Sequence, residues 1–493
     1  MRTRFLPNQL RIWTDGKLFR SQKSIENTEK FYPCISTDTR VIKKGEVFLA
    51  LHGDNFDGHD FIDAAIEKGA GMLIIEEKSD AARKLLPFSA DTDMPDILLV
   101  NDTLRAYMAI AAGYRQTLDT SIIGVTGSVG KTTTRRMIHQ MLASQIITDQ
   151  SDANQNNQIG ISNTILSADP EAQVLVVEIA IDRLGEMEEL SALVRPDIAI
   201  ITGIGHSHAL HLGSIENIFK EKMDLLKHMK DNSFVLLNGK DPMLRNWAKQ
   251  NKDDMRYAVW FVADLDHKDE ILENGFPVFW SENIEIDKES TKFTAKCSFS
   301  AEETWFIELP FAAPHTIEAV LFGLASAYIQ GIDMQIASSS VYNFSNTGAR
   351  QQIVNLNDNI CLFDDSYNSS TEAMESGLIT LSRLSEPKDR IGVFADIREL
   401  GQYAAELHLK AAKQIISAGF REVLLIGDNM RNVKDYIMSN APDIKTSWYS
   451  NRDDLESAVL NSIQAGDTIM VKGSRFFELE HTADLIREKY SQE

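Results

Sequence analysis

The 493-residue sequence has few cysteines and no long apolar segment. Its three cysteines, Cys34, Cys297 and Cys361, lie far apart along the chain, so they suggest neither a disulfide framework nor a zinc site. The first residues, MRTRFLPNQLRIW, lack the continuous apolar stretch of a signal peptide. Since no apolar run is long enough to span a bilayer, we expect a cytoplasmic protein that does not insert into a membrane.

Basic residues are also scarce. The chain has 50 Lys and Arg residues against 72 Asp and Glu residues, which gives a formal net charge of −22. A general nucleic-acid binder needs a basic surface to displace counterions from phosphates, so this class is excluded and the charge is read as an aid to solubility. A nucleotide site is not excluded, because a few backbone amides and one lysine are enough to form it.

The length predicts several domains, and three fit the pattern of apolar runs. The first, residues 1–116, contains strand-like runs such as GEVFLAL and DILLV and a helical run, FIDAAIEKGA. The second, residues 117–340, contains the continuous apolar runs SIIGV, VLVVEIA and DIAIITGIG. Such runs are typical of parallel strands that are buried on both faces, so we expect an α/β fold.

Two parts of the chain differ from this central pattern. Residues 255–310 contain short alternating runs such as TKFTAKCSF, which indicate an antiparallel patch within the central domain. The third domain, residues 341–493, has four apolar runs that each end in a polar or glycine turn, namely NICLFDDSY, RIGVFADI, EVLLIGD and DTIMVKGSR. Amphipathic helices separate these runs, so we predict a Rossmann-like open parallel sheet.

A glycine-rich loop, GVTGSVGKTTT, follows the first central strand and opens a helix. That context is typical of a phosphate-binding loop, in which backbone amides surround the phosphates, a lysine meets the β and γ phosphates and a hydroxyl holds magnesium. The strict Walker motif would have glycine where Val125 stands, so an ordinary glycine turn remains an alternative. The predicted nucleotide contacts are Gly127, Ser128, Val129, Gly130, Lys131, Thr132 and Thr133.

Glu178 and His208 follow the next two apolar runs. Glu178 ends the run VLVVE, where an acid at the carboxyl end of a buried strand can bind a ligand. The alternative is a simple strand-end cap. His208 stands in a loop with two further histidines, and since Mg²⁺ prefers oxygen ligands, an incidental polar loop is an open alternative.

Lys222 falls on the apolar side of an expected helix, SIENIFKEKMDLLKHM, with Ser214 as its N-cap. It is four residues from both Ile218 and Leu226, so it shares their face. A lysine on a buried face must be paired, modified or extended to water. The spacing leaves these three alternatives open.

Taken together, several segments of the chain resemble the Mur ligases of peptidoglycan assembly, from about residue 35 to residue 482. The matching branch of that family adds D-Ala-D-Ala. Besides the phosphate loop, the matching segments are STDTR (36–40), GEVFLALHGDNFDGHDFI (45–62), NQNNQIG (154–160), DDSYNSS (364–370), ADIRELGQYAAELH (395–408) and KGSR (472–475).

The resemblance implies an N-terminal UDP-sugar-binding domain, a central ATPase domain and a C-terminal Rossmann-like domain. It also implies roles for single residues. Thr132 and Glu178 would hold one Mg²⁺, and Glu178, His208 and Lys222 a second, with Lys222 carbamylated. The catalytic residues would be Lys131, Glu178, His208, Lys222 and Asp365. Further ATP contacts would be His315, Arg350, Asp365 and Asn368. The substrate contacts would be Ser36, Asp38, Arg40, Asn156, Asn157 and Tyr367.

The activity that this implies is ATP-dependent amide ligation through an acyl phosphate. The substrates would be UDP-MurNAc-tripeptide and D-Ala-D-Ala, and we expect a monomer that acts in cell-wall synthesis. The chain departs from the usual family residues at Ala180, Asp182 and Thr316, and Ser370-Thr371 replace an Asn-Pro pair. The alternatives are therefore a ligase for another carboxylate and amine, a MurE-type step, which the segment DDSYNSS disfavours, and a non-catalytic nucleotide-binding or regulatory protein.

Overall fold

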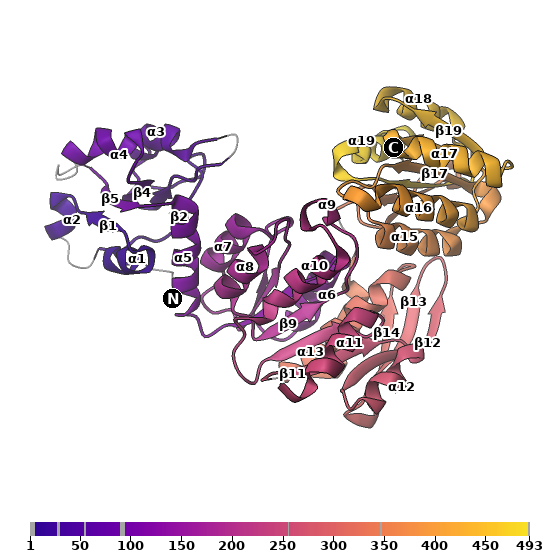
Figure 1. Cartoon of the computed structure of the whole chain (residues 1–493), viewed down its shortest axis with the longest axis horizontal. Helices are drawn as coiled ribbons and strands as arrows, with labels where there is room; N and C mark the ends of the chain where they lie inside the picture. The colour runs from indigo at the N-terminus through magenta and orange to yellow at the C-terminus, as the bar shows by residue number, and fades with distance from the viewer. Residues whose placement is uncertain are drawn as a thin grey trace.

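The computed structural model describes residues 5–26, 30–53, 56–88, 94–254, 256–345 and 348–491. Residues 54–55, within the family-like segment 45–62, lie outside the described residues. Three β-sheets, each formed by one stretch of the chain, divide the molecule into three units. The central unit lies between the other two (Figure 1). The expectation of an α/β protein with three sheet-containing domains is confirmed.

The N-terminal unit has a five-stranded sheet in the order β1-β5-β4-β3-β2. Strand β1 pairs with β5 in the antiparallel direction, and the other strand pairs of this sheet are parallel. Its strands are β1 (Lys17–Phe19), β2 (Ile35–Ser36), β3 (Val47–Leu49), β4 (Met72–Glu76) and β5 (Asp96–Val100), and its helices are α1 (Pro7–Thr14), α2 (Gln22–Glu26), α3 (Ile62–Glu67), α4 (Asp80–Leu85) and α5 (Thr103–Arg115).

The central sheet has nine strands in the order β14-β13-β12-β11-β10-β9-β6-β8-β7. It is parallel from β7 to β12, whereas β12, β13 and β14 pair in the antiparallel direction, so the expected antiparallel patch is confirmed. The strands are β6 (Ser121–Thr126), β7 (Thr148–Gln150), β8 (Val174–Glu178), β9 (Ile198–Ile201), β10 (Phe234–Asn238), β11 (Ala258–Ala263), β12 (Val278–Ile286), β13 (Thr291–Cys297) and β14 (Ser300–Leu309).

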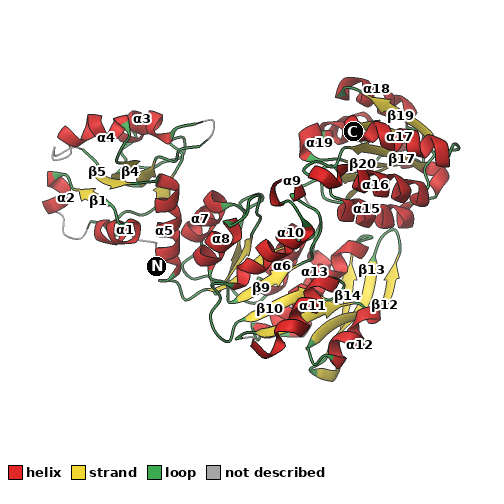
Figure 2. Cartoon of the chain, viewed as in Figure 1, coloured by secondary structure: helices red, strands yellow, loops and turns green. Residues whose placement is uncertain are grey.

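Helices cover both faces of this sheet (Figure 2). Along β8, Leu175 and Val177 join one apolar cluster, while Val174 and Val176 join the opposite cluster. This alternation explains why the strand is apolar throughout. The helices of the unit are α6 (Lys131–Leu142), α7 (Gln158–Ser167), α8 (Glu186–Val194), α9 (Ala209–Leu212), α10 (Ile215–Met223), α11 (Pro242–Asn251), α12 (Leu265–Glu273), α13 (Ile317–Ile329) and α14 (Met334–Ser340).

The C-terminal sheet has six strands in the order β15-β16-β20-β17-β18-β19. Four of them match the expected apolar runs, while β15, which is antiparallel to β16, and β19 are additional. The strands are β15 (Gln352–Asn355), β16 (Cys361–Asp365), β17 (Arg390–Ala395), β18 (Glu422–Ile426), β19 (Lys445–Tyr449) and β20 (Thr468–Lys472), and the helices are α15 (Thr371–Leu384), α16 (Ala404–Ala418), α17 (Asp428–Asn440), α18 (Arg452–Ser462) and α19 (Leu479–Tyr490).

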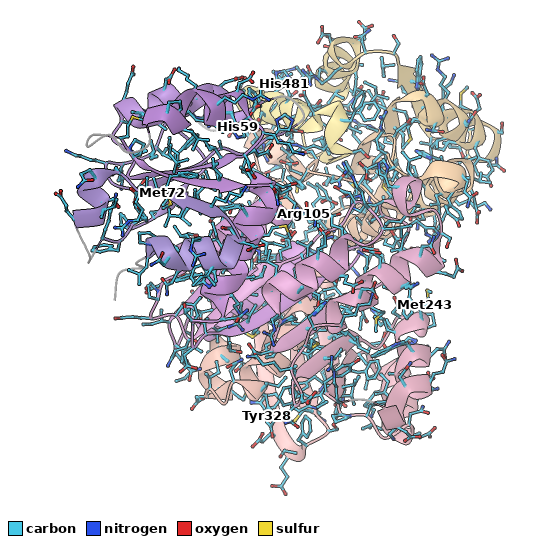
Figure 3. All side chains as sticks on the ribbon, turned by 60° about the vertical axis from the view of Figure 1, so that its left-hand side comes forward. His59, Met72, Arg105, Met243, Tyr328 and His481 are labelled. Carbon is cyan, nitrogen blue, oxygen red and sulfur yellow. The ribbon has the colours of Figure 1, made fainter. Side chains whose placement is uncertain are left out.

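Helix α5 joins the N-terminal unit to the central unit. Its residues Ile110 and Tyr114 belong to one apolar cluster together with Ile161 of α7 and Leu190 of α8. The buried Arg115 at its end forms an ion pair with Asp197, 3.0 Å away. Figure 3 brings the N-terminal unit forward, with His59 and Met72 as markers. The first two units therefore share a continuous core.

The order of the central strands places the predicted site at one edge of the sheet. Strands β8 and β9 lie on either side of β6 and run parallel to it. The loops that follow these three strands therefore meet at their carboxyl ends, where open α/β sheets bind ligands. Within the described residues, no helix combines the length and the apolar character that crossing a membrane requires.

Candidate active site

The glycines of the phosphate loop have the backbone conformations that the motif requires. Gly127 and Gly130 have φ angles of 150° and 87°, and a Cβ atom on Gly127 would lie 2.0 Å from Oγ1 of Thr202. Ser128 donates a hydrogen bond to the carbonyl of Gly205, 3.0 Å away, and thereby ties the loop to the segment after β9. Because of this close approach to Thr202, only glycine fits at position 127.

Helix α6 begins at Lys131, directly after this loop. The helix N-terminus directs backbone N–H groups toward the loop, which is the arrangement that binds phosphate. Thr132 and Thr133 lie in its first turn, and the carbonyl of Val129 accepts a hydrogen bond from the Thr202 hydroxyl. The ammonium of Lys131 donates to the carbonyl of Gly127, 2.8 Å away.

Glu178 is a buried carboxylate that interacts with several polar groups. Its side chain accepts a hydrogen bond from Asn156 (3.0 Å) and lies 3.5 Å from Nε of Arg135. Burial alone would raise its pKa, but the nearby charge of Lys131 and the hydrogen bonds from Asn156 and Thr132 lower it below the usual value. An ionised carboxylate beside the phosphate loop has the oxygen atoms that a divalent cation prefers. The environment of Glu178 therefore favours the interpretation as a cation ligand over that as a simple strand-end cap.

Lys222 is 2% exposed, so the alternative that it extends to water is wrong. Ser214 caps its helix as expected, although α10 ends at Met223, earlier than the apolar pattern predicts. Within the described residues, no hydrogen bond or ion pair reaches its ammonium group. Burial, followed by the charge of Lys131, lowers the pKa of Lys222 well below its usual value. Both effects favour the neutral amine form of this side chain over the ammonium form.

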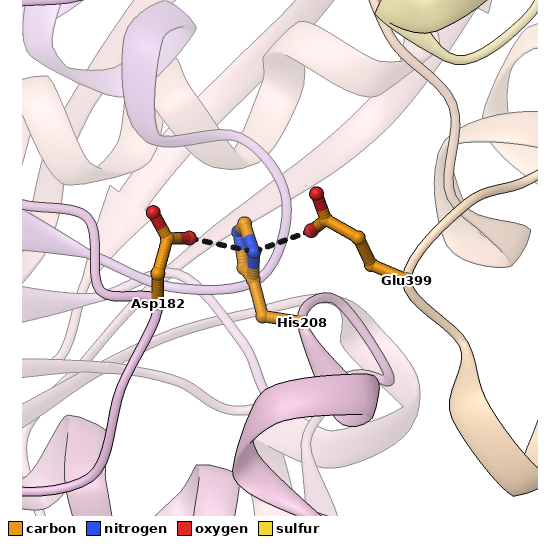
Figure 4. A group of neighbouring side chains, drawn as sticks. All are labelled: Asp182, His208 and Glu399. Carbon is orange, nitrogen blue, oxygen red and sulfur yellow. Dashed lines mark ion pairs between the residues drawn. The ribbon is translucent and has the colours of Figure 1, made fainter. Parts of the chain in front are cut away.

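His208 contacts two carboxylates that were not expected beside it. Its Nδ1 atom lies 2.9 Å from Oδ1 of Asp182 and 2.8 Å from Oε2 of Glu399 (Figure 4). Burial alone would lower its pKa, but the two carboxylates raise it. Within the described part of the chain, no hydrogen bond or ion pair joins His208 to Glu178 or Lys222, the two residues predicted to share a cation with it.

Residues of the C-terminal unit face the phosphate loop. The positive charge of Arg350 lowers the pKa of both Lys131 and Glu178. The guanidinium of Arg350 lies 4.1 Å from the centre of the Tyr367 ring. The Tyr367 hydroxyl in turn donates to the side chain of Asn154 in the central unit. The predicted ATP contact Arg350 is therefore close to the loop that the sequence analysis identified.

Asp365 and Lys472 form a buried ion pair at the ends of β16 and β20, with 2.7 Å between Oδ2 and Nζ. Burial raises the pKa of Asp365 although Lys472 opposes this effect. Lys472 also donates to the carbonyl of Asn368, 3.1 Å away. Lys472 therefore contacts two of the predicted ATP-binding residues, Asp365 and Asn368. The sequence motifs did not mark Lys472 itself as a site residue.

His315 precedes α13 and lies within the electrostatic range of Lys472. Burial, assisted by this lysine, lowers the pKa of His315 to about 4. Within the described residues, its Nδ1 atom is buried without a hydrogen-bond partner, as is the hydroxyl of Thr316, the residue that departs from the family pattern. Thr316 is fully buried.

The predicted contacts for the UDP-substrate lie in the N-terminal unit. Arg40 forms a two-pronged contact with Asp38, at 3.0 Å and 2.7 Å, and the Ser36 hydroxyl donates to the carbonyl of Asp38, 3.0 Å away. Asn156 and Asn157 instead lie in the central unit. Asn157 caps α7 by accepting from the amide of Gly160, 2.9 Å away, and Asn156 binds Glu178, as described above.

Family models match three segments of the chain. Residues 32–114 match the Mur ligase family catalytic domain, residues 125–327 the Mur ligase middle domain, and residues 349–475 the Mur ligase glutamate ligase domain.

Curated relatives match nearly the whole length. The UDP-N-acetylmuramoyl-tripeptide–D-alanyl-D-alanine ligase of Bacillus subtilis is 29% identical over 93% of this chain and 94% of its own length. The Synechocystis protein of the same name is 30% identical over 89% and 88%.

Solved structures share the fold. MurF from Acinetobacter baumannii superposes with a TM-score of 0.83, at 22% identity over 99% of both chains. MurF from Thermotoga maritima, in complex with ADP, has a TM-score of 0.77, at 22% identity over 92% of this chain and 97% of its own. The motifs, the fold and these relatives together place the chain in the Mur ligase family.

Proposed function

We propose that this protein is an ATP-dependent carbon–nitrogen ligase that adds D-Ala-D-Ala to UDP-MurNAc-tripeptide during peptidoglycan synthesis. The names of its curated relatives support the reaction. The observation that carries it is the meeting of two units beside the phosphate loop, where Tyr367 of the C-terminal unit, stacked on Arg350, donates a hydrogen bond to Asn154 of the central unit. A site formed by two units can hold ATP and both substrates together.

The proposal assigns ATP to the phosphate loop and to residues of both units. Phosphates would bind the amides of residues 127–133 and the ammonium of Lys131, which offsets the repulsion between phosphate and an attacking carboxylate. His315 would meet the base, and Arg350, Asp365 and Asn368 would contact ATP from the C-terminal unit. The neighbouring Thermotoga maritima structure contains ADP, which supports a nucleotide in this fold.

We propose Thr132, Glu178, His208 and Lys222 as the ligands of two Mg²⁺ ions. Mg²⁺, when bound, would neutralise phosphate charge. A neutral Lys222 amine can react with CO₂, forming an N–C bond and releasing one proton. The product is a carbamate anion, whose oxygens suit Mg²⁺ where an ammonium does not. The lowered pKa and the buried position of Lys222 support this modification.

The reaction would proceed in two steps. A carboxylate oxygen of the tripeptide attacks the γ-phosphorus of ATP, and the bond to ADP breaks, which gives an acyl phosphate. The amine of D-Ala-D-Ala then attacks the acyl carbon, and the carbon–oxygen bond to phosphate breaks. The residues mainly position the reactants and stabilise charge. Closure of the C-terminal unit would exclude water from the acyl phosphate.

The remaining assignments concern the other parts of the chain. We propose domains at residues 1–116, 117–340 and 341–493, with Ser36, Asp38 and Arg40 binding the UDP-sugar. Asn156, Asn157 and Tyr367 would bind nearer the reacting groups. We also propose that the protein acts as a cytoplasmic monomer, and that its product supports cell-wall biogenesis, cell shape and division.

Phosphate release tests the proposal. Purified protein receives ATP, Mg²⁺, UDP-MurNAc-tripeptide with lysine or diaminopimelate as third residue, and D-Ala-D-Ala. We expect release only when both substrates are present, and transfer of one ¹⁸O atom from a labelled tripeptide carboxylate into phosphate. Lys131→Ala should abolish both signals, whereas Lys220→Ala, an exposed lysine of α10, should retain them. Release with other acid and amine pairs alone would favour a ligase of different substrates, and unlabelled phosphate would exclude the acyl phosphate.

A further inference from the structure

Glu399 makes a contact that crosses between two units. It lies in the loop after β17 of the C-terminal unit, whereas Asp182 and His208 follow β8 and β9 of the central unit. The carboxylates of Asp182 and Glu399 approach the same atom, Nδ1 of His208, from two sides (Figure 4). The side chain of Glu399 is 46% exposed, so burial alone does not hold it in this position.

The backbone around Glu399 is docked as well. The carbonyl of Glu399 accepts a hydrogen bond from the amide of Leu210, 2.8 Å away, and a Cβ atom on Gly401 would lie 3.1 Å from Cα of Leu210. Gln402 donates to the carbonyl of Gly213, 3.5 Å away. Segment 399–402 therefore follows the α9 region over several residues, and the carboxylate contact is one part of this interface.

The contact determines which nitrogen of His208 is free for a cation. A cation at Nε2 needs an imidazole whose single proton is on Nδ1, and the carboxylates of Asp182 and Glu399, 2.9 Å and 2.8 Å from Nδ1, favour a proton on that nitrogen. A carboxylate in this position fixes the orientation of a metal-binding histidine and makes it more basic. Asp182 can orient His208 from within the central unit, whereas Glu399 can orient it only when the C-terminal unit is docked.

We propose that Glu399 is a positioning residue through which docking of the C-terminal unit increases the affinity of the central unit for a divalent cation at His208. The inference rests on the proposed metal-binding role of His208. Because such a coupling is reciprocal, a bound cation must also favour docking. The ion site would thus be complete only in the arrangement that also brings Arg350 to the phosphate loop.

Mn²⁺ binding, followed by electron paramagnetic resonance without any substrate, tests the first half. Glu399→Ala should weaken Mn²⁺ binding by roughly 10-fold, the lower end of the effect of losing an outer carboxylate, because Asp182 remains beside the same nitrogen. Glu399→Gln should fall between this variant and the wild type. The matched control is Glu372→Ala, because Glu372 crosses the same interface to His206, 3.8 Å away. Mn²⁺ affinities within twofold for all proteins, or an equal loss in the control, would overturn the proposal.

Hydrogen exchange at the amide of Leu210 tests the second half, because this amide donates to a backbone carbonyl that Glu399→Ala retains. We expect Mn²⁺ to slow its exchange in the wild type but not in Glu399→Ala. Exchange in the wild type that does not respond to Mn²⁺ would contradict the coupling. Both measurements omit the ligase substrates, so a failure of the proposed ligation remains distinguishable from a failure of this inference.

Discussion

At the scale of single residues, Lys222 has the most unusual environment among the proposed site residues. Its position on the buried face follows from its four-residue spacing to Ile218 and Leu226, so the sequence predicts the burial that the structure contains. The two carboxylates beside His208 are different. Asp182 and Glu399 are 217 positions apart in the numbering, and the pairing depends on tertiary docking that no local pattern encodes. The departure at Asp182 and the family-like segment 395–408, which contains Glu399, are the signals that the sequence offers.

Replacing Lys222 tests its modification. We expect Lys222→Ala to lower ligase activity by roughly 100-fold or more, since the variant loses an anionic group that helps to stabilise charge. Short carboxylic acids such as formate or acetate should restore part of the activity by occupying the position of the carbamate. Phosphate release with both substrates provides the measurement. The matched variant Lys220→Ala should be insensitive to the acids, and a fully active Lys222→Ala would refute the carbamate.

His315 makes stability depend on pH. Its pKa is about 4 in the folded protein, against about 6.5 when unfolded, so the unfolded chain binds the proton first as the pH falls. The contribution of His315 to the free energy of unfolding is complete above about pH 6.5. It is lost progressively as the pH falls toward 4, by up to ~3 kcal/mol. Urea unfolding at about pH 7.5 and about pH 5 should show a smaller loss of free energy of unfolding for His315→Gln than for the wild type.

The exposed His228 supplies the control for this measurement. His228→Gln should reproduce the pH dependence of the wild type. An unchanged pH dependence in His315→Gln would mean that the imidazole of His315 is protonated to the same extent in the folded and unfolded chains.

At the scale of elements, the sequence predicts the apolar strands and the alternating strand β13, and misses two strands that have neither pattern. Strands β8 and β9 are buried throughout, and β6 and β16 are buried except at their first residues, so their apolar composition identifies them. Strands β15 and β19 lie at the two edges of the C-terminal sheet, and none of their residues is fully buried. Edge strands need fewer apolar residues because one side faces solvent, which explains why no apolar run marks them.

The N-cap of α10 should contribute measurably to the order of this helix. Ser214 accepts a hydrogen bond from the amide of Asn217, 3.3 Å away, and loss of such a cap costs about 1 kcal/mol. Ser214→Ala should therefore speed amide exchange in the first turn of α10 by about fivefold. Ser79→Ala removes the equivalent cap of α4 and should affect that helix instead. Equal exchange in α10 of Ser214→Ala and the wild type would show that tertiary contacts alone hold the helix end.

At the scale of the whole molecule, the proposed contacts for the UDP-sugar lie in the N-terminal unit, whereas the phosphate loop lies in the central unit. The sequence indicates three units because each has its own set of apolar runs and turns. It does not reveal how they dock, since the joining contacts, such as Arg115 with Asp197 and Tyr367 with Asn154, connect residues that are distant in the chain. The relative placement of the regions proposed to bind ATP and the UDP-sugar therefore comes from the structure alone.

This separation predicts the kinetic effect of Arg40. Because Arg40 lies in the N-terminal unit, Arg40→Ala should raise KM for the UDP-substrate about tenfold, the equivalent of a contact worth about 1.4 kcal/mol, with kcat nearly unchanged. Steady-state kinetics with varied UDP-MurNAc-tripeptide measures both constants. Arg83→Ala, which alters an exposed arginine of the same unit, should leave both unchanged. Parallel falls in kcat and kcat/KM for Arg40→Ala would instead indicate a role in the chemical step.

Helix α5 has a practical consequence for anyone who divides the protein into pieces. It ends at Arg115, and its Ile110 and Tyr114 pack with residues of α7 and α8. A fragment that ends at residue 116 would expose the apolar face of α5 to water. The remaining fragment would expose the apolar residues of α7 and α8 that pack against this face. Expression of the first two units as one piece would keep this seam closed and avoid the aggregation that uncovered surfaces of this kind promote.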